Sequence, residues 1–222
     1  MKLALFDIDG TLTDSTDVDD FCMTETFQHF LGNNVECDWE SVSHVTDPVI
    51  VRETVERTTG SPCTEEQYAE IKQHFLSLLA EKARTEPERF SAVPGAHAFL
   101  EILAARGVVI GLGTGSWKAS AEIKLNTAGF NFSNYFFAHA DLRNSRAGIA
   151  SNVFAQATAH HGKLPSQWYY FGDGSWDLKT MKQLDWPFIG VDVQENEKLQ
   201  SLGAKQVIHN YNHIQVEDLF SF

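Results

Sequence analysis

The sequence predicts an α/β fold, a doubly wound parallel sheet that carries an inserted all-helical domain. From residue 94 onward, short apolar and aromatic runs alternate with segments of helical length, which is the rhythm of repeated β-α-β units. Before residue 94, a single apolar run at the N-terminus is followed by segments whose apolar residues recur at helical spacing only. We therefore expect a Rossmann-like sheet whose helical insert follows the first strand.

Composition limits the class of protein. The chain has 222 residues, of which 43% are hydrophobic, and its mean hydropathy of -0.24 is that of an ordinary globular protein with a full core. Its net charge of -13 argues against a general affinity for nucleic acid or anionic membranes, so an anionic substrate would need local cations. Neither a signal peptide nor a membrane-spanning apolar run is visible, and we expect a cytoplasmic protein. The pattern does not indicate an oligomeric state.

The N-terminal part predicts one strand and then helices. The run Leu3–Phe6 reads as a buried strand. The first helix of the insert should end at the cluster Gly32-Asn33-Asn34. A second helix should begin with Asp47 as its N-cap, with Pro48 at the first helical position, and a third opens at 64–67 with the pattern of a capping box. Pro94 and Gly95 mark the return to the sheet.

The C-terminal part supplies the rest of the sheet. We expect strands near residues 108–112, 135–138, 168–171, 188–191 and 206–208, and helices near 96–106, 118–128, 149–161, 177–184 and 196–202. These elements divide the chain into a core domain of residues 1–14 and 94–222 and a helical domain of residues 15–93. No repeat or low-complexity tract interrupts this organisation.

Polar residues follow three of the expected strands. They are Asp7 and Asp9 after the first strand, Thr114 and Ser116 after the strand at 108–112, and Asp173 and Asp177 after the strand at 168–171. Because ligands of such sheets bind at the carboxyl ends of the strands, we expect these side chains to meet in one site. Carboxylates this close together repel one another, so a metal cation or a shared proton should lie between them.

These motifs resemble a known family. The segment DIDGTLTD at 7–14, followed by TG at 114–115 and GDGSWD at 172–177, is similar to the haloacid dehalogenase superfamily of phosphotransferases. A helical insert directly after the first motif resembles the C1-type cap of the phosphoglycolate-phosphatase-like subfamily, so the resemblance covers nearly the whole chain. It implies a phosphatase that acts on small phosphomonoesters through an aspartyl-phosphate.

The resemblance also implies roles for the acids. Asp7, Asp173 and the backbone carbonyl of Asp9 would bind the metal, with Asp177 as a further ligand or a partner of the ligands. An all-oxygen site at the ends of three chain segments suits Mg²⁺. Asp7 would attack phosphorus through its other oxygen. Asp9 would protonate the leaving alkoxide and later deprotonate water, which requires that it begins protonated.

Small residues beside these acids are expected to hold the phosphoryl group. Thr11 and Thr114, together with the backbone around Gly115 and Ser116, would donate hydrogen bonds to its oxygens. The alternative is that the two threonines are ordinary turn residues.

The positive charge of the site departs from the family pattern. The family normally supplies a lysine between the second and last motifs, whereas the segment 144–149 contains Arg146. A guanidinium is always protonated and can bridge two oxygens, so we expect Arg146 to pair with the phosphoryl group and the nucleophile. Lys118 and Lys163 are the alternatives, although each reads as a solvated lysine.

The insert should decide the substrate. A helical cap can close over the site and exclude water. Near the start of its second helix, Thr46 and Asp47, with His44 and Arg52, could reach the leaving group, although Asp47 also reads as a helix cap and Arg52 as a solvated residue. A covering cap favours small phosphorylated metabolites over phosphoproteins.

Other functions use similar residues. A phosphomutase of sugar phosphates would retain the aspartyl-phosphate against water, and a non-catalytic relative would bind Mg²⁺ and act through a partner. A dehalogenase has no alkoxide to protonate and thus no use for Asp9. A receiver domain also clusters aspartates, but its phosphate acceptor follows a middle strand. The complete acidic set favours an enzyme.

Overall fold

One parallel sheet forms the centre of the molecule. A computed structural model describes residues 1–32, 35, 37, 39 and 41–221. Its six-stranded sheet has the order β5-β4-β1-β6-β7-β8, and every neighbouring pair is parallel. The strands are β1 (Lys2–Phe6), β4 (Val108–Gly113), β5 (Phe136–Ala138), β6 (Gln167–Gly172), β7 (Phe188–Val191) and β8 (Val207–Ile208). The predicted doubly wound sheet is confirmed, and β1 lies between β4 and β6.

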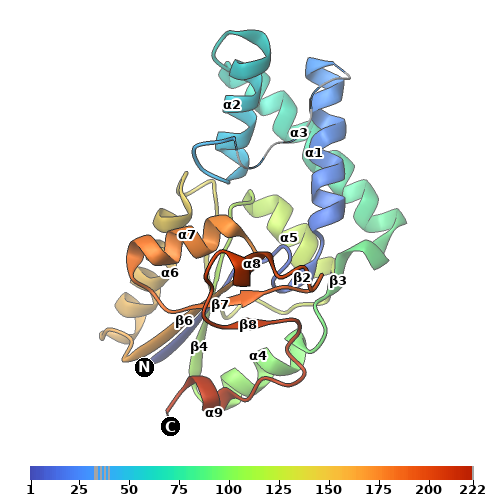
Figure 1. The fold of residues 1–222 in the computed structure, drawn as a ribbon. Helices are drawn as coiled ribbons and strands as arrows, with labels where there is room; N and C mark the ends of the chain where they lie inside the picture. The colour runs from blue at the N-terminus through green and yellow to red at the C-terminus, as the bar shows by residue number, and fades with distance from the viewer. Residues whose placement is uncertain (33–34, 36, 38, 40, 222) are drawn as a thin grey trace.

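Helices cover both faces of this sheet (Figure 1). They are α4 (Ala96–Ala105), α5 (Lys118–Thr127), α6 (Arg146–His161) and α7 (Ser175–Leu184). In β1, Leu3 and Leu5 pack in the cluster that contains residues of α6 and α7, whereas Ala4 and Phe6 pack with residues of α4 and α5. All four side chains are fully buried. The strand is therefore a continuous apolar run rather than an alternating one.

Three helices form the insert at one end of the sheet, away from both termini (Figure 1). They are α1 (Thr16–Leu31), α2 (Asp47–Thr59) and α3 (Glu65–Thr85). They enclose their own apolar cluster, to which the core domain contributes the fully buried Trp117. The predicted capping box of α3 is present, because Thr64 accepts a hydrogen bond from the Gln67 N–H.

A short ladder joins the two ends of the insert. Strand β2 (Thr13–Asp14) pairs antiparallel with β3 (Ser91–Ala92). The sequence does not predict these strands, because two residues are too few to show a period. The ladder brings the chain entering the insert beside the chain leaving it, and we therefore propose residues 15–93 as its boundaries.

Two helix ends differ from the prediction or extend beyond the described part. The expected N-cap of α2, Asp47, is wrong: Thr46 holds the extended N-cap conformation and Asp47 is the first helical residue. Helix α1 ends at Leu31 with Gly32 as its C-cap, whereas Asn33 and Asn34 lie outside the described residues.

The remaining elements are short. They are the 3₁₀ helix η1 (Pro87–Phe90), α8 (Lys198–Ser201) and α9 (Val216–Leu219). None of the helices in the described part of the chain combines the length and apolarity that crossing a bilayer requires.

Candidate active site

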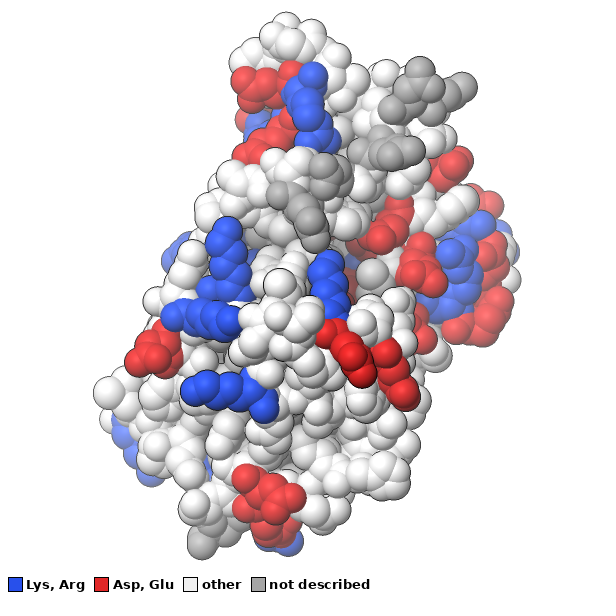
Figure 2. Space-filling model, viewed as in Figure 1, with Lys and Arg blue, Asp and Glu red and all other residues white. Residues whose placement is uncertain are grey.

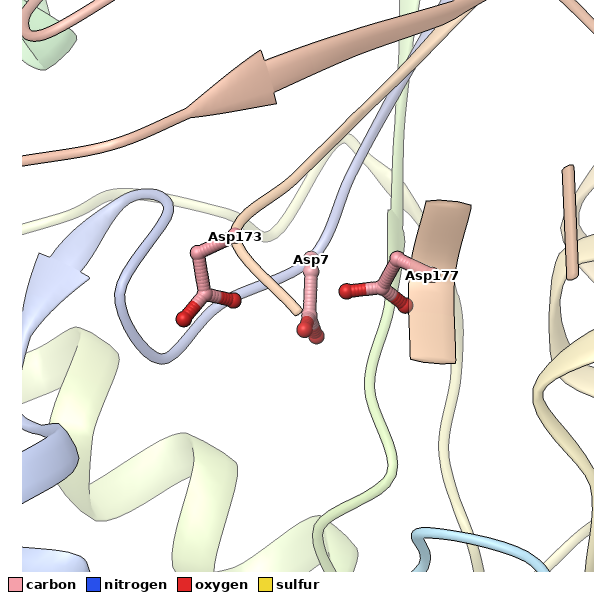
Figure 3. Close-up of side chains that lie close together, drawn as sticks. All are labelled: Asp7, Asp173 and Asp177. Carbon is pink, nitrogen blue, oxygen red and sulfur yellow. The ribbon is translucent and has the colours of Figure 1, made fainter. Parts of the chain in front are cut away.

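Three aspartates meet at the carboxyl end of the sheet. Asp7 directly follows β1, Asp173 follows β6, and Asp177 lies in the first turn of α7. Each offers a carboxylate oxygen, and these oxygens all lie within 4.8 Å of one another. Figure 3 shows the three side chains gathered from these separate segments. The chain thus brings together acids that are far apart in sequence.

Gly10 shapes the turn beneath this cluster. Its φ of +67° lies in the left-handed region, and a Cβ placed there would be 2.2 Å from Oδ2 of Asp173. The backbone can therefore pass close under the carboxylate only because residue 10 has no side chain.

Substituting Gly10 is expected to damage the acid cluster as well as the backbone. We expect Gly10→Ala to lower the unfolding free energy by about 1–2 kcal/mol and to weaken Mg²⁺ binding about tenfold or more, because Asp173 must move. Gly60→Ala is the matched control, since Gly60 has a φ of +71° and nothing within 4 Å of its added Cβ. Urea denaturation and calorimetric Mg²⁺ titration measure the two effects. Equal Mg²⁺ affinity in the two variants would contradict the role of Gly10.

The charges of the three buried acids are only partly compensated by their neighbours. Burial raises the pKa of Asp173 well above its usual value, and the charges of Asp7 and Asp177 raise it further. Burial also raises the pKa of Asp7 and takes that of Asp177 to about 7, although Arg146 opposes both shifts. Among the described residues, Oδ1 of Asp7 and Oδ1 of Asp173 have no hydrogen-bond partner. Buried carboxylates with free oxygens fit a divalent cation that prefers oxygen ligands.

Arg146 lies against the expected nucleophile. Its Nη1 donates to Oδ2 of Asp7 at 2.8 Å and to Oδ1 of Asp177 at 3.5 Å, and its side chain is 12% exposed. Its Nε donates to the carbonyl of Val45 in the insert at 2.9 Å. The alternative cation Lys118 is more than half exposed and pairs with Glu122. The structure thus places Arg146, and not Lys118, against Asp7. Its contact with a phosphoryl group stays a prediction.

Asp9 points toward a different set of partners. The Ser15 hydroxyl donates to its Oδ1 at 2.6 Å, while Lys124 Nζ at 2.8 Å and the Ser116 hydroxyl at 3.2 Å contact its Oδ2. Burial alone would raise the pKa of Asp9, but the Lys124 ammonium and these hydrogen bonds lower it below its usual value. Asp9 is thus a carboxylate in this arrangement and must gain a proton before it can act as an acid.

The sequence interpretation missed Lys124. This lysine lies in the middle of α5 and is fully buried, with ion pairs to Asp9 and, at 2.5 Å, to Asp19 of α1. A signal was available, because the spacing of Ala121, Lys124 and Leu125 puts the lysine on the apolar face of the helix. A lysine on a buried face requires a partner.

The small residues after β4 divide into two groups. Gly115 and Ser116 line the cavity that contains Asp7 and Asp9. A Cβ at Gly115 would be 2.6 Å from the Val45 carbonyl and 2.8 Å from Cζ of Arg146, so the insert and the arginine both approach this backbone closely. Thr114 instead is buried and does not line this cavity, and its hydroxyl accepts the Ser116 N–H at 3.0 Å.

Thr11 is enclosed in the turn after β1. Its side chain is fully buried, and its hydroxyl has no hydrogen-bond partner in the described part of the chain. Its carbonyl accepts a hydrogen bond from the Tyr211 hydroxyl at 3.0 Å. The roles of Thr11 and Thr114 in phosphate binding therefore stay predictions.

The insert residues expected to bind substrate contact the core domain. The Thr46 hydroxyl donates to the carbonyl of Asn144 at 3.1 Å, and Oδ2 of Asp47 accepts the Trp117 N–H at 2.8 Å. Both side chains are buried, although Asp47 also lines the cavity. Arg52 instead pairs with Glu65 on an exposed face. As placed, Thr46 and Asp47 attach the insert to the loops of the sheet.

Asp47 should make stability depend on pH. Burial raises its pKa to about 6, against the lowering effect of the Lys124 charge. A carboxyl whose pKa is higher in the folded state favours folding below the unfolded pKa, and this contribution is lost as the pH rises through the folded pKa. As the pH rises from about 4 to 7, we expect the unfolding free energy of Asp47→Asn to increase relative to that of the wild type by at most about 3 kcal/mol.

Urea denaturation in EDTA at several pH values measures this difference. The amide oxygen of the introduced asparagine can still accept the Trp117 N–H, so the hydrogen bond itself is retained. The exposed Asp17→Asn on α1 is the control. A difference for Asp47→Asn that is flat with pH would show that its carboxyl does not carry the effect.

Two adjoining cavities lie between the sheet and the insert. One of about 520 Å³ is lined by Asp7, Asp9 and Asp173 of the core domain and, from the insert side, by Asp20, Trp39 and Ile50. The other, of about 730 Å³, is lined by Lys179 and Lys182 of α7. Figure 2 shows basic side chains gathered on the face over α7. The acidic protein thus presents a local positive surface beside the acid cluster.

The chain is similar to known proteins in sequence and in structure. Residues 1–185 match the family model of haloacid dehalogenase-like hydrolases. No curated protein matches the sequence significantly. A hydrolase from Pseudomonas syringae is 19% identical with a TM-score of 0.75, and the match covers 100% of both chains.

Two further solved structures are similar at this level. CbbY from Rhodobacter sphaeroides, in complex with phosphate, is 17% identical with a TM-score of 0.70 over 95% of both chains. A β-phosphoglucomutase from Clostridium difficile is 18% identical with a TM-score of 0.70, over 97% of this chain and 94% of the other. At these identities the matches show a common fold, and their coverage includes the helical insert.

Proposed function

Since the chain belongs to the haloacid dehalogenase-like hydrolase family, we propose that it is a Mg²⁺-dependent phosphatase of small phosphomonoesters that forms an aspartyl-phosphate. The observation that carries this proposal is the meeting of Asp7, Asp173 and Asp177 with the Arg146 guanidinium at the end of β1. A phosphomonoester dianion can approach these acids only where positive charge compensates them.

The residues present can divide the reaction into two steps. In the first, an oxygen of Asp7 attacks phosphorus, the bond to the ester oxygen breaks, and a protonated Asp9 gives its proton to the leaving alkoxide. In the second, Asp9 takes a proton from water as the water oxygen attacks phosphorus, and the bond between phosphorus and Asp7 breaks. Orthophosphate and the free Asp7 carboxylate result.

Positive charge would come from the protein and from the metal. Arg146 donates a hydrogen bond to Oδ2 of Asp7, which holds the nucleophile in place, and its charge favours the phosphoryl group. Asp7, Asp173, Asp177 and the carbonyl of Asp9 would hold Mg²⁺, which when bound neutralises charge on the phosphoryl oxygens. Backbone N–H groups around Gly115 and Ser116 would orient those oxygens.

The surroundings of the site favour a small phosphorylated substrate. Residues of the insert line the same cavity as Asp7, Asp9 and Asp173, and its volume of about 520 Å³ suits a metabolite. Lys179 and Lys182 beside it would attract an anion to an otherwise acidic protein. CbbY, similar in fold, has been crystallised with phosphate and with xylulose-1,5-bisphosphate.

A phosphomutase is the second candidate, because the fold matches that of a β-phosphoglucomutase. Both reactions share the first step, and they differ in whether water or a sugar phosphate receives the phosphoryl group. Supplying a sugar phosphate and measuring isomer formation alongside free phosphate separates the two. Isomer formation without net phosphate release would replace the phosphatase proposal.

The direct test is phosphate release across a panel of phosphomonoesters, including p-nitrophenyl phosphate. We expect turnover that EDTA abolishes and added Mg²⁺ restores. Turnover that persists in EDTA would contradict the metal-dependent mechanism, and no turnover on any member of the panel would contradict the phosphatase.

A further inference from the structure

We propose that Lys124 is a positioning residue that fixes the Asp9 carboxylate for proton transfer, through a buried cluster that it shares with Asp19 of the insert. This inference rests on the proposed function, in which Asp9 carries the proton. It assigns a role to a lysine outside the motifs of the sequence, in the middle of a helix.

The first support is that the lysine is buried and that all the contacts of its ammonium are with polar groups of one cluster. Its side chain is 0% exposed, and an ammonium has three N–H donors. Its Nζ donates to Oδ2 of Asp9 at 2.8 Å and to the Ser116 hydroxyl at 3.2 Å, and it forms an ion pair with Oδ1 of Asp19 at 2.5 Å. Because a buried charge is unfavourable without such partners, these contacts hold the ammonium in one position.

The second support is that Arg146 and Lys124 pair with different acids of the site. Arg146 pairs with Asp7, and Lys124 is the cation paired with Asp9 in the described part of the chain. The other contacts of Asp9 are two neutral hydroxyls, of which that of Ser116 is longer at 3.2 Å. Without Lys124, Oδ2 would keep only this weaker contact, and the carboxylate could turn away from the position it now holds.

The third support is that the cluster joins both domains. Asp19 lies on α1, Asp9 in the turn after β1 and Lys124 on α5. The same ammonium contacts both aspartates, so the position of the insert helix and that of the proton carrier are fixed together. Lys124 is therefore placed to act through Asp9 and has no need to touch the substrate.

Substrates with different leaving groups distinguish positioning from a general structural role. In the first step, an alkyl phosphate such as β-glycerophosphate needs a proton at the leaving oxygen, whereas p-nitrophenolate leaves without one. In the second step, hydrolysis of the aspartyl-phosphate needs Asp9 with both substrates. For Lys124→Met we expect kcat to fall about 30- to 100-fold on both substrates with KM within about threefold.

The pre-steady state then separates the two steps. With p-nitrophenyl phosphate we expect Lys124→Met to release one phenolate per active site in a burst whose rate is within about threefold of wild type, since only water attack is slowed. With β-glycerophosphate the first step itself should be slow. A structural defect would instead lower the burst amplitude and slow both substrates at the first step.

Matched variants complete the test. Lys118→Met changes an exposed lysine on the same helix and should behave as wild type, and Lys124→Arg should recover part of the loss. In an Asp9→Asn background, Lys124→Met should add less than about threefold, because its effect passes through Asp9. If Lys124→Met lowers kcat in the Asp9→Asn background by the same factor as in the wild type, the proposal is overturned.

A separate control tests whether Lys124→Met loses turnover because it is less stable. Lys124→Met leaves Asp9 and Asp19 buried without a cation, so we include Lys124→Met/Asp19→Asn, which removes one positive and one negative charge together. The double variant should recover the unfolding free energy but retain the slow water step. Recovery of wild-type turnover by the double variant would overturn the proposal.

A crystal structure of Lys124→Met decides the positioning independently of turnover. We expect the Asp9 carboxylate to leave the place where Ser15 and Ser116 contact it. An unmoved carboxylate would overturn the inference even if the wild type is a phosphatase. A displaced carboxylate in a protein without turnover would support the positioning and contradict only the proposed function.

Discussion

Asp7→Asn is expected to abolish turnover while leaving the fold intact. The carboxylate of Asp7 lies at the end of the central strand β1, is 2% exposed, and has one oxygen on Arg146. An amide has nearly the same shape but is a far weaker nucleophile, so the aspartyl-phosphate cannot form. We expect kcat to fall about 10³-fold or more. Phosphate release measures the loss, and mass spectrometry of trapped wild-type enzyme should find the phosphate on the peptide that contains Asp7.

Although Asp7→Asn should abolish turnover, we expect it to make the folded protein more stable. Burial and the nearby Asp9 charge raise the pKa of Asp7, although Arg146 opposes them. At neutral pH the ionised form is therefore disfavoured in the folded protein, and the neutral amide should raise the unfolding free energy in EDTA. The exposed Asp218→Asn on α9 is the control for both measurements. Turnover above about a tenth of wild type in Asp7→Asn would contradict the nucleophile assignment.

The local sequence pattern was sufficient to predict the strands of the sheet and the positions of the acidic residues. The two central strands β1 and β4 are apolar runs that are almost fully buried, and Asp7, Asp173 and Asp177 follow β1 and β6 within a few residues. Because the topology of a parallel sheet brings strand ends together, sequence position alone predicts that these side chains meet. The acid cluster of Figure 3 therefore follows from the order of strands and motifs along the chain.

The missed features depend on contacts between distant segments. Lys124 is explained only when α1 brings Asp19 against α5. The capping rule suggests Asp47 as the N-cap of α2, but its carboxylate instead accepts the buried Trp117 N–H, whose need for an acceptor is invisible in sequence. The ladder of β2 with β3 depends on the insert folding back on itself.

Arg146→Ala should produce the second large loss. Removing the guanidinium leaves Asp7 and Asp177 buried without their cation, which we expect to lower the unfolding free energy in EDTA by about 3–5 kcal/mol. Saturating Mg²⁺ should restore part of that stability, because it supplies charge to the same acids. Turnover should still fall about 10²- to 10³-fold, since Arg146 also holds the nucleophile in place. Urea denaturation with and without Mg²⁺ and steady-state kinetics measure both effects.

Arg146→Lys separates charge from shape. A lysine keeps the positive charge, but one ammonium cannot reproduce the planar fork that donates to Asp7 through Nη1 and to the Val45 carbonyl through Nε. We expect most of the lost stability to return and kcat to remain about tenfold below wild type. The exposed Arg143→Ala in the same loop is the control. If Arg146→Lys restores full turnover, the contact with Val45 has no role in catalysis.

The outcome for Arg146 also tests whether an arginine can take the place of the lysine usual in this family. If Arg146→Ala keeps both turnover and affinity for inorganic phosphate, the cation of the site is another residue. If affinity for phosphate falls in Arg146→Ala but recovers in Arg146→Lys, charge is what the phosphoryl group requires, and the fork of the arginine serves to join the nucleophile to the insert. That second result is the one we expect, because the guanidinium contacts the Asp7 carboxylate and the insert backbone at once.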